Sequence, residues 1–391
     1  MPTQSPPIQP SPTQPGPVRS AETSRRSPGT IALGRIAGVP IGVHWSLLII
    51  GTLLGVSLAN GTLESQFPGY GTDTYAITAA IGVLLFFAAV LAHEVAHALM
   101  ARRFGVETEG IDLWILGGVA RLTSEPPTPR ADAAIAAAGP AASLVCAAGF
   151  LAVGYGLDAI DAPGVLAPML GWLGIVNIVL AVFNLLPASP LDGGRILRAA
   201  LWARSNDRDS AGIVAAKVGK VLGVAIALAG FWMVLNGRAG LMTMIVGWFI
   251  LSNAKVEAHV LSTRKALRGR SVRDLTSFGV ARADDWTDTD TMLSQRDRLG
   301  QPGVVAVVGF GGTLKGLVTE AQMRMIPHDR RSSTTLAQLA IGLDRLPAAD
   351  VDEDLIEVLD RADTLSAGII TVWDDGKLVG VVRPERLRNA A

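Results

Sequence analysis

The sequence is poor in two kinds of residue, and each scarcity limits what the chain can be. It has one cysteine, Cys146, within an apolar run, so a single chain can form neither an internal disulfide framework nor a cysteine-based metal site. Charged residues make up 17% of the 391 residues, whereas soluble domains have about a quarter. No cluster of lysines and arginines suggests nucleic acid as a partner. With 49% hydrophobic residues, the composition predicts a membrane protein with a soluble part.

Long apolar runs predict about six transmembrane helices, because about 20 apolar residues cross a bilayer. Arg102 and Arg103 directly follow the second run, and arginines also precede the first, while the loop between them has neither lysine nor arginine. The positive-inside rule then places the N-terminus in the cytoplasm of a multi-pass protein of the cell membrane. The six runs are residues 41–59, 75–100, 131–155, 165–186, 211–235 and 241–251.

Residues 1–30 differ from the apolar part of the chain. They are rich in proline, glutamine, serine and threonine, which predicts a disordered tail. No apolar segment closely follows a basic start, so the pattern is not that of a signal peptide. We expect the transmembrane domain to occupy residues 31–262.

From about residue 271 the composition becomes that of a soluble domain, and the sequence repeats itself. Residues 304–319 and 369–382 each read as two strands around a turn, about 65 residues apart. The sequence therefore predicts two α/β modules, at residues 268–328 and 329–391. The basic residues that precede them indicate a cytoplasmic side.

The second apolar run contains the motif His-Glu-x-x-His. His93 and His97 are four residues apart and share one face of a helix, at the spacing with which two imidazoles bind one zinc ion. Glu94 lies beside them and can transfer protons. So short a motif also arises by chance, but ionisable residues are costly in a membrane and are rare there unless they pair, bind an ion or act in catalysis. The setting favours a metal site.

Two further residues are candidate ligands, because a catalytic zinc site needs a third protein ligand and one open position. Asp192 follows the fourth apolar run, in a segment rich in proline and glycine, at the same expected depth as the histidines. It is either this ligand or a helix cap. His44, near the start of the first run, is either a ligand or a polar residue at the membrane surface.

Residues 111–122 interrupt the helical pattern and predict a β-hairpin. Gly117 and Gly118 form its turn, since glycine tolerates the positive φ angles of tight hairpins. Non-helical backbone at membrane depth is tolerated only where protein covers it or water reaches it. The hairpin is therefore either membrane-associated and near the site, or exposed at the surface.

Taken together, these motifs resemble those of the site-2 protease family of intramembrane zinc metalloproteases. The resemblance rests on the pairing of His-Glu-x-x-His with residues 184–195, which fit the pattern N-x-x-P-x-x-x-x-D-G-G, and it covers about residues 41–253. It implies regulated intramembrane proteolysis, in which a peptide bond is hydrolysed within or near the transmembrane segment of a membrane protein. The implied substrate is a protein with a single transmembrane span in the lipid bilayer, and in this family it is often an anti-sigma factor.

The resemblance also implies a role for individual residues. One zinc ion per chain is bound by His93, His97 and Asp192, and Glu94 is the general base and acid. Asn184 matches an asparagine that positions the substrate or stabilises the oxyanion.

The C-terminal repeat resembles a tandem pair of CBS modules, which implies modulation of the activity, often by adenine nucleotides. Gln322 stands where an aspartate that binds ribose is usual in the first module, and Arg383 and Arg386 replace the usual residues in the second. Either the arginines contact phosphates, or the pair only forms a homodimer. A competing reading of the whole chain is a CBS-regulated membrane transporter or channel, whose histidines and acids line an ion path.

Overall fold

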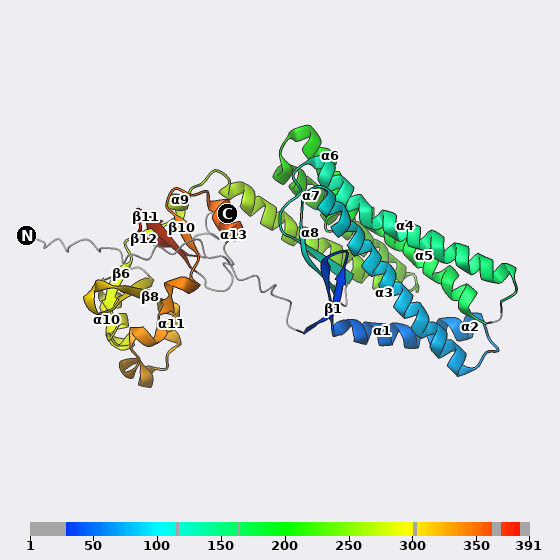
Figure 1. Cartoon of the computed structure of the whole chain (residues 1–391), viewed down its shortest axis with the longest axis horizontal. Helices are drawn as coiled ribbons and strands as arrows, with labels where there is room; N and C mark the ends of the chain where they lie inside the picture. The colour runs from blue at the N-terminus through cyan, green and yellow to red at the C-terminus, as the bar shows by residue number, and fades with distance from the viewer. Residues whose placement is uncertain (1–28, 115–116, 163, 300–302, 362–368, 384–391) are drawn as a thin grey trace, which may run out of the picture. The chain divides into compact units, whose positions relative to one another are not determined.

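A computed structural model describes residues 29–114, 117–162, 164–299, 303–361 and 369–383 (Figure 1). The chain divides into two compact units, with the boundary between Leu261 and Ser262. The first unit carries the apolar helices and the second carries the repeat. The expected disordered tail lies outside the described residues, apart from residues 29 and 30.

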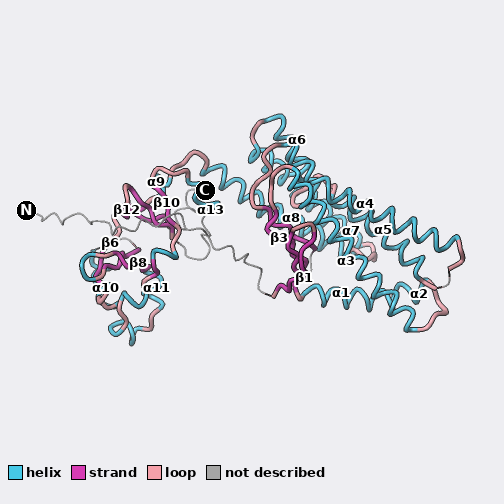
Figure 2. The backbone as a smooth tube through the Cα atoms, viewed as in Figure 1, coloured by secondary structure: helices cyan, strands magenta, loops and turns pink. Residues whose placement is uncertain are grey.

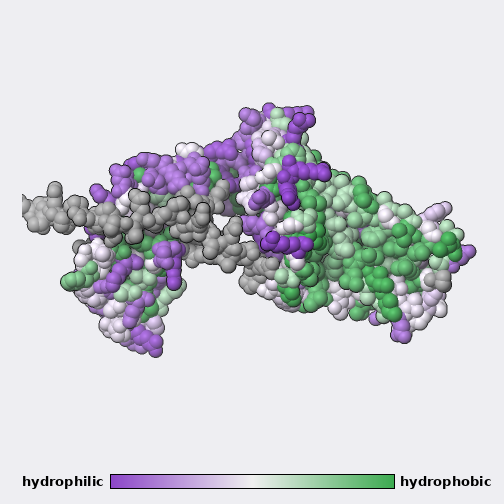
Figure 3. Space-filling view, in the orientation of Figure 1, coloured by the Kyte–Doolittle hydropathy of each residue, from purple (hydrophilic) through white to green (hydrophobic). Residues whose placement is uncertain are grey.

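Within the described residues, five helical stretches are long and apolar enough to cross a membrane. The first, Ser46–Gln66, joins α1 (Ser46–Ser57) through a π-helical turn (Leu58–Leu63) to α2 (Glu64–Gln66). The other four stretches are α3 (Thr72–Arg103), α4 (Pro129–Ala159), α5 (Leu166–Asn184) and α7 (Arg208–Leu235). The surface over these long helices is mostly hydrophobic (Figure 3).

The sixth expected span falls in α8 (Leu241–Leu267), which is not among these five stretches. Its first half is apolar, but Lys255 and Glu257 make its second half too polar for a long apolar window. A short amphipathic helix, α6 (Asp192–Ser205), lies between α5 and α7 in the chain. It packs against both α4 and α7.

A four-stranded sheet accompanies the helices of the first unit (Figure 2). The predicted hairpin is confirmed as β3 (Thr108–Trp114) and β4 (Gly117–Leu122), which pair antiparallel. The expectation that Gly117 and Gly118 form its turn is wrong, because both lie in β4 and pair with Trp114 and Leu113. The strands β1 (Thr30–Ile36) and β2 (Val39–His44) extend the hairpin to the order β1-β2-β3-β4, with β2 parallel to β3. β4 is therefore one edge of the sheet, and it packs against α3.

The expectation that the first apolar run is helical throughout is wrong at its start. Residues up to His44 form β2, and the helix begins at Ser46. Ile41 and Val43 pair with Ile111 and Leu113 in the parallel register. A short apolar run cannot be assigned to strand or helix by its pattern alone, and here a strand partner about 70 residues away decides.

The second unit contains two sheets of the same design, which confirms the predicted repeat. Each has a parallel pair of strands followed by two antiparallel neighbours. The first has the order β6 (Ala281–Asp284), β7 (Val304–Val308), β8 (Leu314–Thr319) and β9 (Ile341–Gly342). The second has the order β10 (Ala348–Asp350), β11 (Ile370–Asp374), β12 (Lys377–Val382) and β5 (Ser277–Phe278).

The two sheets exchange elements across the expected boundary between residues 328 and 329. β5 precedes the strands of the first sheet in the chain but belongs to the second, and β9 belongs to the first. A shared hydrophobic cluster joins Val304 and Leu317 to Val381. The helices of this unit are α9 (Val272–Leu275), α10 (Thr289–Leu299), α11 (Glu320–Met325), α12 (Leu336–Leu339) and α13 (Leu355–Arg361), with 3₁₀ turns at Phe310–Gly312, His328–Ser333 and Leu343–Arg345.

Candidate metal centre

Three predicted residues converge in the first unit. His93 and His97 lie one turn apart on α3, and each is 5% exposed. Asp192 is the first residue of α6 and is 9% exposed. It comes after the break between α5 and α6, so a carboxylate remote in sequence reaches the two imidazoles.

The donor atoms of these residues form a small triangle. Nε2 of His93 lies 3.1 Å from Nε2 of His97, and Oδ2 of Asp192 lies 3.3 Å from each of these nitrogens. Ligand atoms about 2.0–2.1 Å from a tetrahedral zinc ion lie roughly 3.3 Å from one another. Among the described residues, this is the one group of three such side chains whose donor atoms converge. The donor set and its spacing fit zinc.

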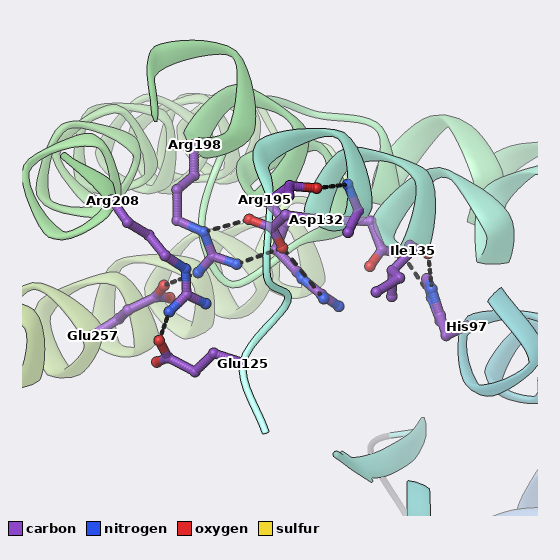
Figure 4. A network of polar contacts seen from close by, with 11 residues as sticks. His97, Glu125, Asp132, Ile135, Arg195, Arg198, Arg208 and Glu257 are labelled. Carbon is purple, nitrogen blue, oxygen red and sulfur yellow. Dashed lines mark hydrogen bonds and ion pairs between the residues drawn. The ribbon is translucent and has the colours of Figure 1, made fainter. Parts of the chain in front are cut away.

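The other ring nitrogens are held by α4. Nδ1 of His97 lies 2.7 Å from the carbonyl oxygen of Ile135, so it carries the proton and donates it (Figure 4). Nδ1 of His93 lies 2.9 Å from Oγ of Ser143, which is fully buried. A proton on Nδ1 leaves the Nε2 lone pair free for a metal, and such outer contacts fix the ring orientation.

Asp192 has the charge that a ligand needs. Its Oδ2 atom faces the Nε2 atoms of both imidazoles, so an ionised carboxylate there would attract a divalent cation to the same point as the two nitrogens. As the first residue of a helix it also lies where the helix dipole favours a negative charge. The cap residue of α6 is Leu191, and no side chain makes a cap hydrogen bond there, so the structure favours the ligand reading of Asp192 over the cap reading.

Gly139 provides the space in front of the histidines. It lies on α4, and a Cβ atom added to it would be 2.6 Å from Nε2 of His93 and closer still to Nε2 of His97. These are the two atoms that would bind the metal. α4 therefore contributes the outer partners of both rings and a side chain small enough to leave their inner nitrogens accessible.

The side chain of Glu94, a residue of α3, lies next to strand β4 of the sheet. It is half-buried, and a Cβ atom at Gly118 of β4 would lie 2.8 Å from its Cδ and 3.0 Å from its Oε1. The sheet edge thus covers the carboxylate closely. A group placed beside the metal ligands and next to an extended edge strand can act on a peptide held along that strand.

Two other predicted residues, Asn184 and His44, make side-chain contacts of their own. Asn184 is the last residue of α5, and its side-chain amide donates to the carbonyl oxygen of Leu180 at 3.0 Å. Its role in catalysis stays a prediction. His44 ends β2, with Nδ1 2.8 Å from Oγ of Ser46, and is not part of the convergent group.

Sequence reasoning did not identify Ile135 or Ser143 as parts of the site. It allowed the hairpin that contains Gly118 to lie near the site, but it predicted no contact of Gly118 with Glu94 or of Gly139 with the histidines. Their contacts depend on how α4 and β4 pack against α3, which one residue's identity does not reveal. The small residues of α4 predict that it packs closely against other helices, but they do not predict which of its atoms contact the histidines of α3.

We predict that Gly139→Ala weakens zinc binding by roughly 100-fold or more, because the new methyl group meets the metal-binding face of both imidazoles. Competition with a chromophoric chelator measures the zinc dissociation constant. Gly149→Ala on the same helix is the matched control, since a Cβ atom there meets nothing within 4 Å. Equal zinc affinity in the two variants would contradict this account of Gly139.

Several known proteins are similar to this chain. The model of Peptidase family M50 matches residues 81–159 and 157–230. Rip3 of Mycobacterium tuberculosis, which carries the name of a zinc metalloprotease, is 38% identical over 358 residues, covering 90% of this chain and 91% of that protein. The protein sll0528 of Synechocystis, also named as a zinc metalloprotease, is 28% identical over 366 residues, covering 90% of this chain and 93% of that protein. A solved site-2 protease from Methanocaldococcus jannaschii covers 59% of this chain and 95% of its own, with 29% identity and a TM-score of 0.41.

Proposed function

The chain belongs to the M50, or site-2 protease, family of zinc metalloproteases, and on this basis we propose that it cleaves membrane proteins within or near a transmembrane segment. The observation that carries this proposal is the convergence of His93, His97 and Asp192 in an apolar helical unit. A metal centre enclosed by apolar helices suits a substrate that is itself in the membrane. Such cleavage is the chemical step of regulated intramembrane proteolysis.

The roles of the residues follow from their places. His93, His97 and Asp192 would hold a zinc ion, which when bound would supply Lewis acidity: it would polarise a carbonyl group and lower the pKa of a water molecule to about 7. Glu94 takes a proton from the attacking water and passes it to the leaving amine, which balances the hydrolysis. Ser143 and Ile135 keep the imidazoles oriented throughout. Asn184 is the candidate donor to the oxyanion.

Substrate presentation is the second part of the proposal. A peptide bond within a helix is shielded, so the substrate must unwind locally before attack. The edge strand β4 offers backbone groups to an extended segment, and strand addition would lay that segment beside Glu94. The proposed partner is a membrane protein with a single span, such as an anti-sigma factor.

We predict that Glu94→Gln abolishes most of the cleavage of a single-span substrate in detergent, with a fall of about 100-fold to 10,000-fold. Zinc content should be unchanged, because Glu94 is not one of the three converging ligands. Gel analysis of cleavage and metal analysis of the same samples measure both quantities. Cleavage by Glu94→Gln at the rate of the unmodified protein would refute the mechanism.

A photoreactive residue at Ala120 of β4 should crosslink to bound substrate, because β4 is the sheet edge next to Glu94. The matched control is a photoreactive residue at Ala32 of β1, on the opposite edge, which should not crosslink. Mass spectrometry of the products identifies the position. Crosslinks at Ala32 but not at Ala120 would exclude strand addition at β4.

For the second unit, we propose a cytoplasmic module that joins two chains and modulates the protease. In the first module, Thr319 and Gln322 form a reciprocal helix cap. The backbone N–H of Gln322 donates to Oγ1 of Thr319 at 3.1 Å, and the backbone N–H of Thr319 donates to Oε1 of Gln322 at 2.9 Å. These polar groups are therefore occupied, and the aspartate that usually binds ribose is absent. Of the two roles considered for this pair, we therefore propose dimerisation.

Titration calorimetry of the full chain with AMP and ATP should therefore give no saturable heat. A protein with the usual ribose-binding aspartate would give a clear binding curve. Saturable binding of either nucleotide would show that arginines such as Arg383 replace the missing aspartate.

A further inference from the structure

A buried ion pair lies close to the metal centre but outside it. Asp132 is fully buried in the first turn of α4. Arg198 on α6 donates to both of its oxygens, from Nε at 2.9 Å and from Nη2 at 2.8 Å (Figure 4). Nη2 of Arg195 lies 3.5 Å from the same carboxylate. A buried carboxylate without a partner is costly, so this two-pronged contact fixes α6 against α4.

The pair joins the two elements that build the metal centre. On α4, Asp132 lies three residues before Ile135, whose carbonyl oxygen holds His97. On α6, Arg198 lies six residues after Asp192, the carboxylate that completes the triangle. α4 already holds the outer nitrogens of both imidazoles. The Asp132–Arg198 contact therefore sets where Asp192 lies relative to the two Nε2 atoms.

The same guanidinium group reaches a third helix. Nη1 of Arg198 lies 3.9 Å from Oε1 of Glu257 on α8, whose side chain is 31% exposed. The side chain of Arg198, which belongs to α6, thus contacts one residue of α4 and one residue of α8. Because α8 is the last helix of the first unit, it is the element through which the chain continues to the second.

We propose that Arg198 is a positioning residue of the metal centre: it holds Asp192 in place through Asp132, and it links that position to α8 through Glu257. The side-chain contacts of Arg198 are with Asp132 and Glu257, so it acts on the metal ligands through other residues. The proposal depends on the metal centre and is independent of which substrate is cleaved, so it can be tested without a cleavage assay.

The test compares Arg198→Lys with Arg204→Lys in the full chain. Lysine keeps the charge at position 198 but cannot form the two parallel contacts with Asp132. Arg204 is an exposed residue of the same helix. Arg198→Lys should raise the zinc dissociation constant about 10-fold to 100-fold, as loss of an outer contact does, and should change the visible absorption spectrum of the cobalt-substituted protein. Arg204→Lys should change neither quantity.

A purely structural role predicts a different result. In that case Arg198→Lys would lower the melting temperature while the zinc affinity and the cobalt spectrum stayed unchanged, and the proposal would be wrong. Equal changes in Arg198→Lys and Arg204→Lys would also overturn it, because the effect would then come from any altered arginine on α6.

A second variant covers the case in which Arg198→Lys does not fold. Glu257→Gln removes the charge of a partly exposed side chain and keeps its shape. It should weaken zinc binding about threefold, which is less than the change expected for the buried contact. Where Arg198→Lys does fold, Glu257→Gln should have no effect in that background, since its influence passes through Arg198. An unchanged zinc affinity in Glu257→Gln alone, or the same change in both backgrounds, would refute the link to α8.

Discussion

The fold of the first unit depends on one constraint: two imidazoles and a carboxylate are buried together among apolar helices. Buried polar groups must find partners, since water cannot reach them easily. His93 and His97 turn their outer nitrogens to α4 and their inner nitrogens to one another and to Asp192. A divalent cation between the inner atoms would satisfy all three, so one bound metal would meet the partner requirement of every buried polar group at this site.

That constraint explains why backbone comes so close to the site. Gly139 and Gly118 lie where any larger residue would occupy the space of the histidines or of Glu94. The first leaves room beside the histidines of α3, and the second brings an edge strand within reach of the carboxylate to which we assign proton transfer. A helix thus lies close on one side and a strand on the other, and the strand's outer edge is not paired by any described strand.

The sequence was most informative where the chemistry is local. Helical spacing places His93 and His97 together, and the apolar setting argues for a metal. The spacing is compatible with Asp192 as either a ligand or a cap, and the family resemblance favours the ligand. The non-local features were not predictable: Ile41 and Val43 pair with strands far along the chain, and β5 and β9 exchange between sheets. Such pairings depend on packing that a one-dimensional pattern does not contain. The relatives that match over 90% of the chain are named as zinc metalloproteases, and not as the transporter or channel that the sequence also allowed.

X-ray absorption at the zinc edge tests the central claim most directly, because it counts the ligand types at the bound metal. We predict one zinc ion per chain, with two imidazole nitrogens and otherwise only oxygen atoms as ligands, all at about 2.0–2.1 Å from the metal. Asp192→Ala should lose an oxygen neighbour while both imidazoles remain. A third imidazole, which would point to His44, or a spectrum unaltered by loss of Asp192 would contradict the site described for His93, His97 and Asp192.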